Sequence, residues 1–470
     1  MNGLSFGTDG MRGSAFAELD EVVAHALGQA ANRVLTGGAA CVGSACWAVG
    51  RDTRESSPAL ARALAAGLRA AGAEVIDLGV VPTPVVAFAA GHLGTAGAMV
   101  SASHNPWHDN GVKLFATGGI KLSDAAQAAV SQCLADVGLT HGDRPSAADV
   151  LRRGEADSTA ERAAPADESA RVLDAYEASL ADAIDQRTLD GLHLVVDGAN
   201  GASASLAPEV LRRLGAQVTA LSCDPDGRNI NDGCGSVSPG SLQAAVVEVG
   251  ADVGLAFDGD GDRLIAVDSG GQVIDGDRQM ALFAVDLHER GLLADNTLVV
   301  TVMSNLGLHR AMAEAGIAVV QTAVGDRAVL EALDAGGHSL GGEQSGHVVF
   351  GREATTGDGL RSAVHLADLV ARRAAGSGGS ALSSAALAAQ AMQAAPQVLR
   401  NVPAGSGLLT DEIQRAIDEI AAEAGTDVRV LVRASGTEPV IRVMVEASTE
   451  RDAAILADRL IEVVSAAGAG

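Results

Sequence analysis

Residues 192–221 read LHLVVDGANGASASLAPEVLRRLGAQVTAL and contain a complete strand–helix–strand pattern. Apolar residues dominate 192–196, and a Gly-containing turn separates them from a segment, 208–214, whose apolar residues recur at helical spacing. Gly215 suits the left-handed conformation that ends many helices, and the run at 218–221 predicts a second strand. Strands that alternate with short helices indicate βαβ units and largely parallel sheets.

The same pattern occurs in two further segments, 47–78 and 297–321, whose predicted helices end at Gly72 and Gly316. Near the C-terminus the pattern changes to two apolar strands followed by a helix, which is typical of a small α+β domain. We therefore predict an α/β protein with three similar α/β domains and mostly parallel sheets, and with a smaller C-terminal α+β domain. The predicted domains are 1–160, 170–268, 269–383 and 395–470.

Length and composition limit the possible classes of protein. The chain has 470 residues, which is too long for one hydrophobic core, and 47% of them are hydrophobic, which is enough for several. A formal net charge of −26 argues against nucleic acid and anionic membranes as partners. Five cysteines without a CxxC pair indicate neither a disulfide framework nor a cysteine zinc site. Because no signal segment and no uninterrupted apolar span is seen, we expect a cytoplasmic protein.

A potential nucleophile lies in the motif SASHNP, residues 101–106, which follows an apolar strand predicted at 97–100. Ligands of α/β proteins bind in crevices at the carboxyl ends of strands, which is where this motif falls. It offers Ser103 as a nucleophile, with His104 beside it and Lys113 further along the chain. Taken alone, the motif is also typical of an Asn-Pro turn with a serine cap.

Three carboxylates stand at alternate positions of DGDGDR, residues 258–263, and they are those of Asp258, Asp260 and Asp262. The intervening glycines permit tight bends, so that the three side chains can converge on one hard cation. A short loop leaves coordination positions open, which favours Mg²⁺ with a phosphate ligand over an enclosed Ca²⁺ site. The EF-hand spacing fails because Ser269 stands at the twelfth loop position. The alternative is a solvated acidic turn.

Three further loops carry polar groups suited to a sugar phosphate. FGTDGMRG at 6–13 contains Arg12, and RASGTEP at 433–439 joins two predicted strands. Arginine combined with hydroxyl groups and glycine backbone can cradle a phosphate, although each loop can also be a turn with a surface salt bridge. The motif GGEQSGH at 341–347 ends an apolar strand, and its side chains suit sugar hydroxyls or, for His347, proton transfer.

One distinctive loop falls in each predicted domain, so that the loops together supply what phosphoryl transfer needs: a nucleophile, a cation site and positive groups. Seven motifs follow one another along the chain: FGTDGMRG, SASHNP, DNGVK, DGDGDR, VGDR, GGEQSGH and RASGTEPVIRVM. With these motifs the chain resembles the α-D-phosphohexomutase family from Phe6 to its last helix. The resemblance implies four domains around a central cleft.

The resemblance also implies a role for each matching residue. Ser103 is expected to be the phosphorylated serine, and its phosphate is expected to bind Mg²⁺ together with Asp258, Asp260 and Asp262. The residues expected to move protons or stabilise charge are Arg12, Lys113 and His347. Those expected to contact the sugar are Glu343 and Ser345, and the loop expected to hold the non-reacting phosphate comprises Arg433, Ser435, Gly436 and Thr437. Arg263, Gly325, Asp326 and Arg327 are expected to line the cleft.

The implied reaction interconverts glucosamine 6-phosphate and glucosamine 1-phosphate. Phosphoserine gives its phosphoryl group to the free 1-hydroxyl, and the resulting sugar 1,6-bisphosphate, which also serves as activator, turns over so that Ser103 takes back the other phosphate. Three alternatives stay open: phosphoglucomutase or phosphomannomutase activity on the same scaffold, a non-catalytic sugar-phosphate binding protein, and a phosphatase-like hydrolase. The sequence does not decide between a monomer and a homodimer.

Overall fold

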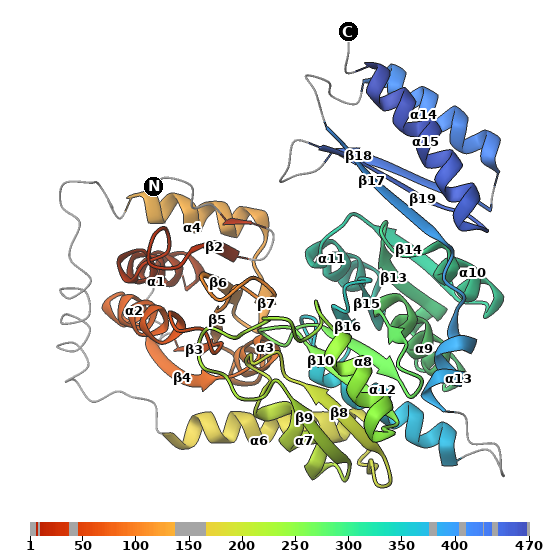
Figure 1. Ribbon diagram of the computed structural model, residues 1–470. Helices are drawn as coiled ribbons and strands as arrows, with labels where there is room; N and C mark the ends of the chain where they lie inside the picture. The colour runs from red at the N-terminus through yellow and green to blue at the C-terminus, as the bar shows by residue number, and fades with distance from the viewer. Residues whose placement is uncertain are drawn as a thin grey trace. The chain divides into compact units, whose positions relative to one another are not determined.

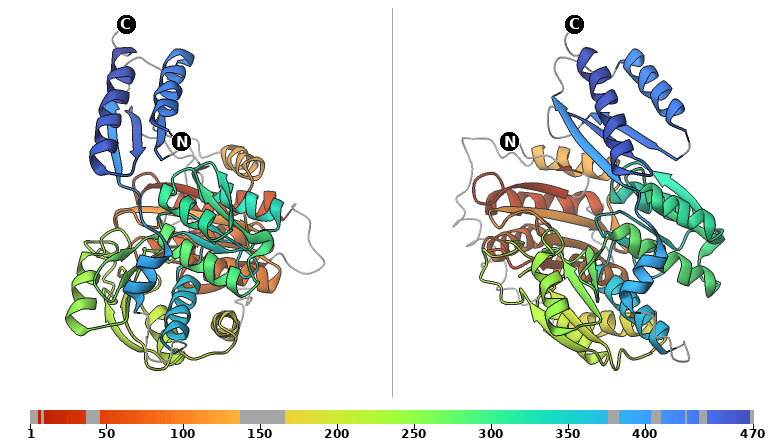
Figure 2. Two further views of the ribbon diagram at one scale, coloured as in Figure 1. Left: turned by 90° about the vertical axis from the view of Figure 1, so that its right-hand side faces the viewer. Right: turned by 45° about the vertical axis from the view of Figure 1, so that its right-hand side comes forward.

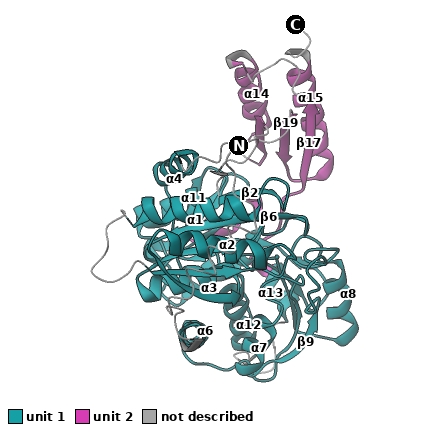
Figure 3. Ribbon diagram, turned by 90° about the vertical axis from the view of Figure 1, so that its left-hand side faces the viewer, with its two compact units in different colours: residues 1–303, 317–389 teal, residues 304–316, 390–470 magenta. Residues whose placement is uncertain are grey.

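The computed structural model describes residues 6–7, 10–36, 46–136, 166–375, 383–403, 410–425, 427–434 and 440–467 (Figure 1). The chain divides into two compact units (Figure 3). The first unit comprises 1–303 with 317–389 and holds three sheets, and the second comprises 304–316 with 390–470 and holds a fourth.

Each sheet of the first unit has three adjacent parallel strands that run to one edge of the sheet. They are β4 (Glu74–Val80), β3 (Cys46–Arg51) and β5 (Ala96–Val100) in the first sheet, β9 (Gln217–Leu221), β8 (His193–Asp197) and β10 (Val253–Phe257) in the second, and β14 (Ala318–Thr322), β13 (Thr297–Thr301) and β15 (Leu340–Gly342) in the third. Gly72, Gly215 and Gly316 have φ values of +89°, +104° and +71°, as expected of left-handed helix ends. The predicted threefold repeat is thus confirmed.

An antiparallel strand follows the third parallel strand in every one of these sheets. These strands are β6 (Asp109–Ala116), β11 (Leu264–Asp268) and β16 (Val348–Phe350), and further antiparallel strands are β1 (Phe6–Gly7), β2 (Gly10–Ser14), β7 (Ile120–Lys121) and β12 (Val273–Ile274). The sheets are therefore mixed, whereas the sequence predicted mostly parallel ones. The prediction missed these strands because each is reached by a short loop rather than by a crossover helix.

Helices cover the sheets of the first unit, and their buried side chains are mainly Ala, Val and Leu. They are α1 (Glu21–Leu35), α2 (Ser57–Ala70), α3 (Thr83–Leu93), α4 (Asp124–Asp136), α6 (Ala166–Ala183), α7 (Leu206–Arg213), α8 (Gly240–Val249), α9 (Gly276–Glu289), α11 (Asp326–Gly336), α12 (Gly359–Ala375) and α13 (Ser384–Ala391), with a 3₁₀ turn at Ala294–Asn296. In the part of the chain that the structure describes, no helix is both long and apolar enough to cross a membrane.

The second unit is a three-stranded antiparallel sheet with two helices over it (Figures 1 and 2). Its strands are β17 (Gln397–Pro403), β19 (Val440–Glu446) and β18 (Arg429–Ala434) in spatial order, and the two helices over the sheet are α14 (Asp411–Ala424) and α15 (Glu450–Ala467). A cluster of Val, Ile and Leu side chains fills the space between sheet and helices. The predicted C-terminal α+β domain is confirmed, and the four domain boundaries stay a prediction.

A helix from the third repeat, α10 (Leu306–Glu314), belongs to this second unit. Buried Glu446 of β19 accepts hydrogen bonds from the Leu306 amide (2.8 Å) and from Asn305 Nδ2 (3.1 Å), and it pairs with Arg429 (3.1 Å). Burial raises the pKa of Glu446, although Arg429 and the Leu306 amide oppose the rise. The contact fastens the start of α10 to the fourth sheet.

Helices α1 and α2 pack through glycines. A Cβ atom added at Gly67 would lie 1.9 Å from the carbonyl oxygen of His25, and one added at Gly28 would lie 2.4 Å from that of Leu64. Side chains larger than hydrogen are therefore excluded on both helices at this crossing.

We predict that Gly67→Ala lowers the free energy of unfolding by about 1–3 kcal/mol, the usual cost of over-packing, because the helices must separate to admit the methyl group. Urea denaturation of the two proteins measures this difference. Gly240→Ala is the matched control, since a Cβ at Gly240 meets no atom within 4 Å, and its stability should equal or slightly exceed that of the parent. A Gly67→Ala protein as stable as this control would contradict the packing described.

Candidate active site

The three motif loops of the first unit occupy equivalent positions in the three sheets. Residues 101–108 join β5 to β6, residues 258–263 join β10 to β11, and residues 343–347 join β15 to β16. Each loop therefore begins at the carboxyl end of the third parallel strand of its sheet, where α/β proteins commonly bind ligands. The repeated topology brings side chains from three distant segments of the chain to one site.

Ser103 lies at the centre of this site and is 1% exposed. Its Oγ donates a hydrogen bond to Asp258 Oδ2 at 2.6 Å, and its amide donates to Ser101 Oγ at 3.0 Å. His104 Nδ1 is 3.4 Å from the same Oγ. Burial, reinforced by the positive charges of Arg263 and Arg12, lowers the pKa of His104 to about 4, so its ring is neutral near pH 7.

The acidic triad of Asp258, Asp260 and Asp262 is buried. One carboxylate oxygen from each residue lies within 4.8 Å of the others. Burial and the neighbouring charges of Asp262 and Asp260 raise the pKa of Asp258 well above its ordinary value. Burial acts in the same direction on Asp262, but the ammonium group of Lys113, followed by His347 and Arg263, outweighs it and holds the pKa of that carboxyl well below its ordinary value.

The triad fits a divalent cation. Asp260 Oδ1 and Asp262 Oδ1 are buried and accept no hydrogen bond from the residues that the structure describes, although buried oxygens normally have a donor. Carboxylate oxygens are the ligands that hard cations such as Mg²⁺ prefer. A cation between these oxygens would satisfy both and would relieve the repulsion among the three carboxylates.

Lys113 on β6 reaches the same carboxylates from the first sheet. Its Nζ lies 2.8 Å from Asp260 Oδ2 and 2.9 Å from Asp262 Oδ2, and its side chain is 3% exposed. A buried ammonium group is stable only when paired, and here two carboxylates provide the pairing. Lys113 thereby ties the first sheet to the loop of the second.

His347 contributes an imidazole from the third sheet, and its orientation is fixed from two sides. Its Nδ1 is 3.7 Å from Asp262 Oδ1, and its Nε2 accepts the Gly357 amide proton at 3.1 Å. The neutral ring therefore carries its own proton on Nδ1, the nitrogen that faces Asp262. A Cβ on Gly357 would lie 2.5 Å from the ring, so a glycine is needed behind it.

Two arginines predicted at the site lie near the triad. The amide of Arg263 donates to Asp258 Oδ1 at 3.2 Å, and its Nε is 3.8 Å from Asp262 Oδ1. Arg12 is half-buried on β2, opposite Gly111 of β6, and its charge contributes to the lowered pKa of His104. Both guanidinium groups thus add positive charge beside Ser103.

The predicted sugar-contacting loop meets the VGDR loop. Glu343 Oε1 accepts a hydrogen bond from the Gly325 amide at 3.1 Å, whereas the buried hydroxyl of Ser345 has no partner within the described ranges. Asp326 is paired with Lys121, and Arg327 with Asp124. The two charged residues of the VGDR loop therefore contact the first sheet and the helix that follows it.

The predicted phosphate loop is described only at its start. Arg433 lies on β18, opposite Arg442 of β19, and both belong to the second unit. Arg442 belongs to the motif RASGTEPVIRVM, but the motif analysis gave it no role. Ser435, Gly436 and Thr437 lie outside the described residues.

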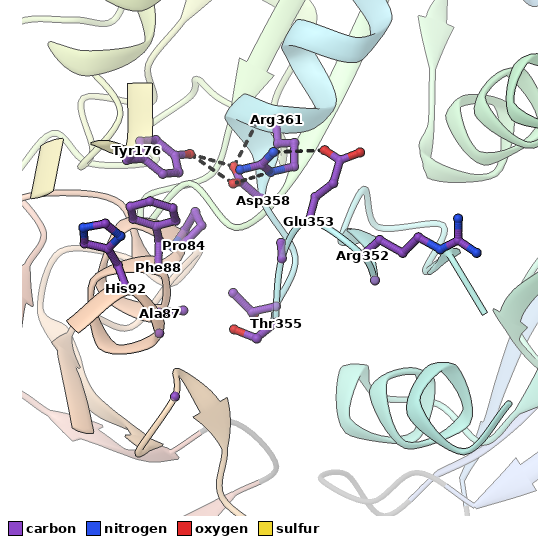
Figure 4. A pocket seen from close by; sticks show the side chains of 15 residues that line it. Pro84, Ala87, Phe88, His92, Tyr176, Arg352, Glu353, Thr355, Asp358 and Arg361 are labelled. Atoms are coloured by element: carbon purple, nitrogen blue, oxygen red, sulfur yellow. Dashed lines mark hydrogen bonds and ion pairs between the residues drawn. The ribbon is translucent and has the colours of Figure 1, made fainter. Parts of the chain in front are cut away.

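A cavity of about 310 Å³ lies beside α3, α6 and the segment 351–358 (Figure 4). Four of its polar side chains pair with one another: Tyr176 donates to Asp358 at 2.9 Å, and Arg361 donates to Glu353 at 2.9 Å. Asp358 also accepts from the Arg361 amide (3.0 Å) and so caps α12. Gly357, whose amide orients His347, directly precedes Asp358, so this network supports it.

Sequence reasoning missed several side chains that hold the site together. Thr83 Oγ donates to Asp260 Oδ2 at 2.5 Å, and Asn231 Nδ2 donates to the carbonyl oxygens of Ser103 (2.9 Å) and Asn105 (3.1 Å). The buried Arg54 contacts the same loop. These residues stand in no recognisable motif, and only the fold brings them to the site.

Comparison with known proteins places the chain in a family. Models of the phosphoglucomutase/phosphomannomutase family match it over the α/β/α domain I (3–139), domain II (174–271), domain III (275–390) and the C-terminal domain (387–463). The chain therefore belongs to the phosphoglucomutase/phosphomannomutase family of phosphohexomutases, which are isomerase-class phosphotransferases.

Individual relatives are similar over nearly the full length. The phosphoglucosamine mutase of Frankia casuarinae is 49% identical over 98% of both chains, and that of Rhodococcus erythropolis is 47% identical over 98% of this chain and 99% of its own. A phosphoglucomutase/phosphomannomutase family protein from Burkholderia thailandensis has a TM-score of 0.77 at 28% identity, covering 99% of this chain and 98% of its own. The N-acetylphosphoglucosamine mutase of Aspergillus fumigatus, solved with GlcNAc-6P and magnesium, shares the fold (TM-score 0.67, 20% identity, 99% and 96% covered).

We predict that Gly357→Ala lowers turnover about 100-fold, because the new methyl group displaces the His347 ring by roughly 1 Å. Steady-state kinetics with a hexose phosphate measures the effect, and circular dichroism verifies the fold. Gly240→Ala again serves as the control and should leave turnover unchanged. Unaltered turnover of folded Gly357→Ala would show that the position of His347 is unimportant.

Proposed function

We propose that this chain acts as a phosphoglucosamine mutase and interconverts glucosamine 6-phosphate and glucosamine 1-phosphate through phosphorylated Ser103. The observation that carries the proposal is the 2.6 Å hydrogen bond from the buried Ser103 hydroxyl to Asp258 of the acidic triad. A serine held against a cation site is what storage of a phosphoryl group requires. The similarity to full-length phosphoglucosamine mutases at 47–49% identity supports the choice of substrate.

In the proposed reaction, the bond between phosphorus and Ser103 Oγ breaks as a bond to the sugar hydroxyl forms, and the hydroxyl proton passes to a base. The second half reverses these changes with the other phosphate of the sugar 1,6-bisphosphate, after that intermediate has turned over. Ser103 thus ends phosphorylated, and no phosphate is released. A rigid loop matters here, because an in-line reaction depends on the position of Oγ.

Mg²⁺ would be held by Asp258, Asp260 and Asp262 together with the phosphate on Ser103. When bound, it would neutralise charge on the phosphate oxygens. Lys113, which contacts two of the same carboxylates, would hold positive charge or move a proton beside them. His347 is the second candidate for proton transfer, since it is oriented by Gly357 and faces Asp262.

Substrate recognition is proposed to use the third and fourth domains. Glu343 and the unsatisfied hydroxyl of Ser345 would bind sugar hydroxyls, with Arg263, Gly325, Asp326 and Arg327 nearby. Arg433, Ser435, Gly436 and Thr437 would hold the phosphate that is not reacting. The cytoplasmic location and the choice between monomer and homodimer stay predictions.

The substrate assignment is tested by comparing kcat/KM for the 1-phosphates of glucosamine, glucose and mannose with Mg²⁺ present. We expect glucosamine 1-phosphate to be preferred by at least about tenfold, because a site that hydrogen-bonds one substituent discriminates against analogues lacking it. Preference for glucose or mannose would instead indicate phosphoglucomutase or phosphomannomutase activity. Release of free phosphate would indicate a hydrolase.

The nucleophile is tested by mass spectrometry of the purified protein and its peptides. We expect a phosphate on Ser103 in part of the molecules. Ser103→Ala should abolish turnover, by at least about 10⁴-fold, while substrate still binds, because the oxygen that stores the phosphoryl group is gone. Ser205→Ala is the control, since Ser205 is exposed and makes no capping hydrogen bond, and it should be fully active. Full activity of Ser103→Ala would refute the assignment.

A further inference from the structure

Arg54 is a completely buried arginine that stands outside all the motifs of the site. A guanidinium group has five N–H donors in a planar fork, and here each of them is used. Nε donates to Asp52 Oδ2 at 2.7 Å. The other four donate to backbone carbonyl oxygens of the Ser103 loop, at Ser103 (2.9 Å), Asn105 (2.9 Å) and Pro106, and to that of Asp109 (3.0 Å), where β6 begins.

Asp52 extends this network to the other side of the nucleophile. Its carboxylate accepts hydrogen bonds from Ser101 Oγ (2.6 Å), Ser57 Oγ (2.5 Å) and the Arg54 amide (3.0 Å). Ser101 Oγ in turn accepts the hydrogen bond from the Ser103 amide at 3.0 Å. The Asp52–Arg54 pair therefore fixes both the N–H and the C=O of Ser103.

The backbone of Ser103 needs such support. Its φ is +51°, a left-handed conformation that is costly for a residue other than glycine and persists only where the surroundings enforce it. Arg54 Nη2 and Asn231 Nδ2 both donate to its carbonyl oxygen, each at 2.9 Å. Without these donors the peptide can rotate, and the Ser103 hydroxyl then moves away from Asp258.

We propose that Arg54, held by Asp52, is the positioning residue that sets the Ser103 hydroxyl in line with the acidic triad. The inference rests on the proposed role of Ser103 as the phosphorylated residue. Arg54 acts through geometry rather than charge, because the carboxylate of Asp52 neutralises it at 2.7 Å and its side chain is shielded from solvent and substrate. Lysine keeps the charge but has three donors and no planar fork, so it cannot replace the five hydrogen bonds.

The test compares the full-length wild type with Arg54→Lys. We expect kcat to fall about 100-fold per folded molecule, KM for glucosamine 1-phosphate to change less than about threefold, and the phosphorylated fraction of Ser103 to fall. Hydrogen exchange followed by mass spectrometry should show faster exchange in the peptide covering 101–109. Arg372→Lys is the control, because Arg372, like Arg54, is held by carboxylate pairing, in its case with Asp286 and Asp368, away from the loop. It should have wild-type kinetics.

A purely structural role for Arg54 would reduce the folded fraction but leave kcat per folded molecule and the exchange rate over 101–109 unchanged. That result would overturn the proposal.

If Arg54→Lys does not fold, Ser101→Ala provides the test, because it removes only the hydroxyl between Asp52 and the Ser103 amide. A kcat about tenfold lower at unchanged KM supports the proposal, and an unchanged kcat overturns it. Wild type without phosphate on Ser103 would overturn the proposed function as well, whereas phosphorylated wild type beside a fully active Arg54→Lys overturns only this inference.

Discussion

Repulsion among the buried carboxylates of Asp258, Asp260 and Asp262 is the constraint around which the first unit is built. Like charges in a low-dielectric interior destabilise a fold unless positive groups surround them. The protein places Lys113 of the first sheet between two of them and His347 of the third sheet beside one. The contacts that relieve the repulsion are therefore the same ones that bring three sheets to one site.

The threefold repeat explains how such different loops come together. In each sheet the third parallel strand ends in a loop that turns back into an antiparallel strand, as β10 does into β11. Equivalent loops diverge in chemistry, carrying a serine, an acidic triad or a histidine, while their positions in the fold stay the same. Loops at one topological position thus present different side chains on the same kind of scaffold.

The sequence predicted the repeating strands and helices well, because periodicity and glycine position are local signals. Gly215, for example, has the positive φ that its place after a helix predicted. The antiparallel strands of the first unit were missed. A strand such as β16 has only three residues, and only a short loop separates it from the strand with which it pairs. The hydrogen bond from Asn231 to the Ser103 carbonyl oxygen could not be predicted either. The two residues lie 128 positions apart in the sequence, and only tertiary packing brings them together. A local sequence pattern alone does not establish the catalytic and binding roles that we propose for the motif side chains.

The assignment of α10 to the second unit has a consequence for how the C-terminal domain is attached. The chain passes between the two units at 303/304, at 316/317 and at 389/390, so three backbone crossings join them. Cleavage of the chain at 389/390 alone would not release residues 390–470. The hydrogen bonds from Asn305 and the Leu306 amide to buried Glu446 would still hold them to the start of α10. Such a nicked molecule would migrate as one particle under native conditions and separate into two fragments only in denaturant.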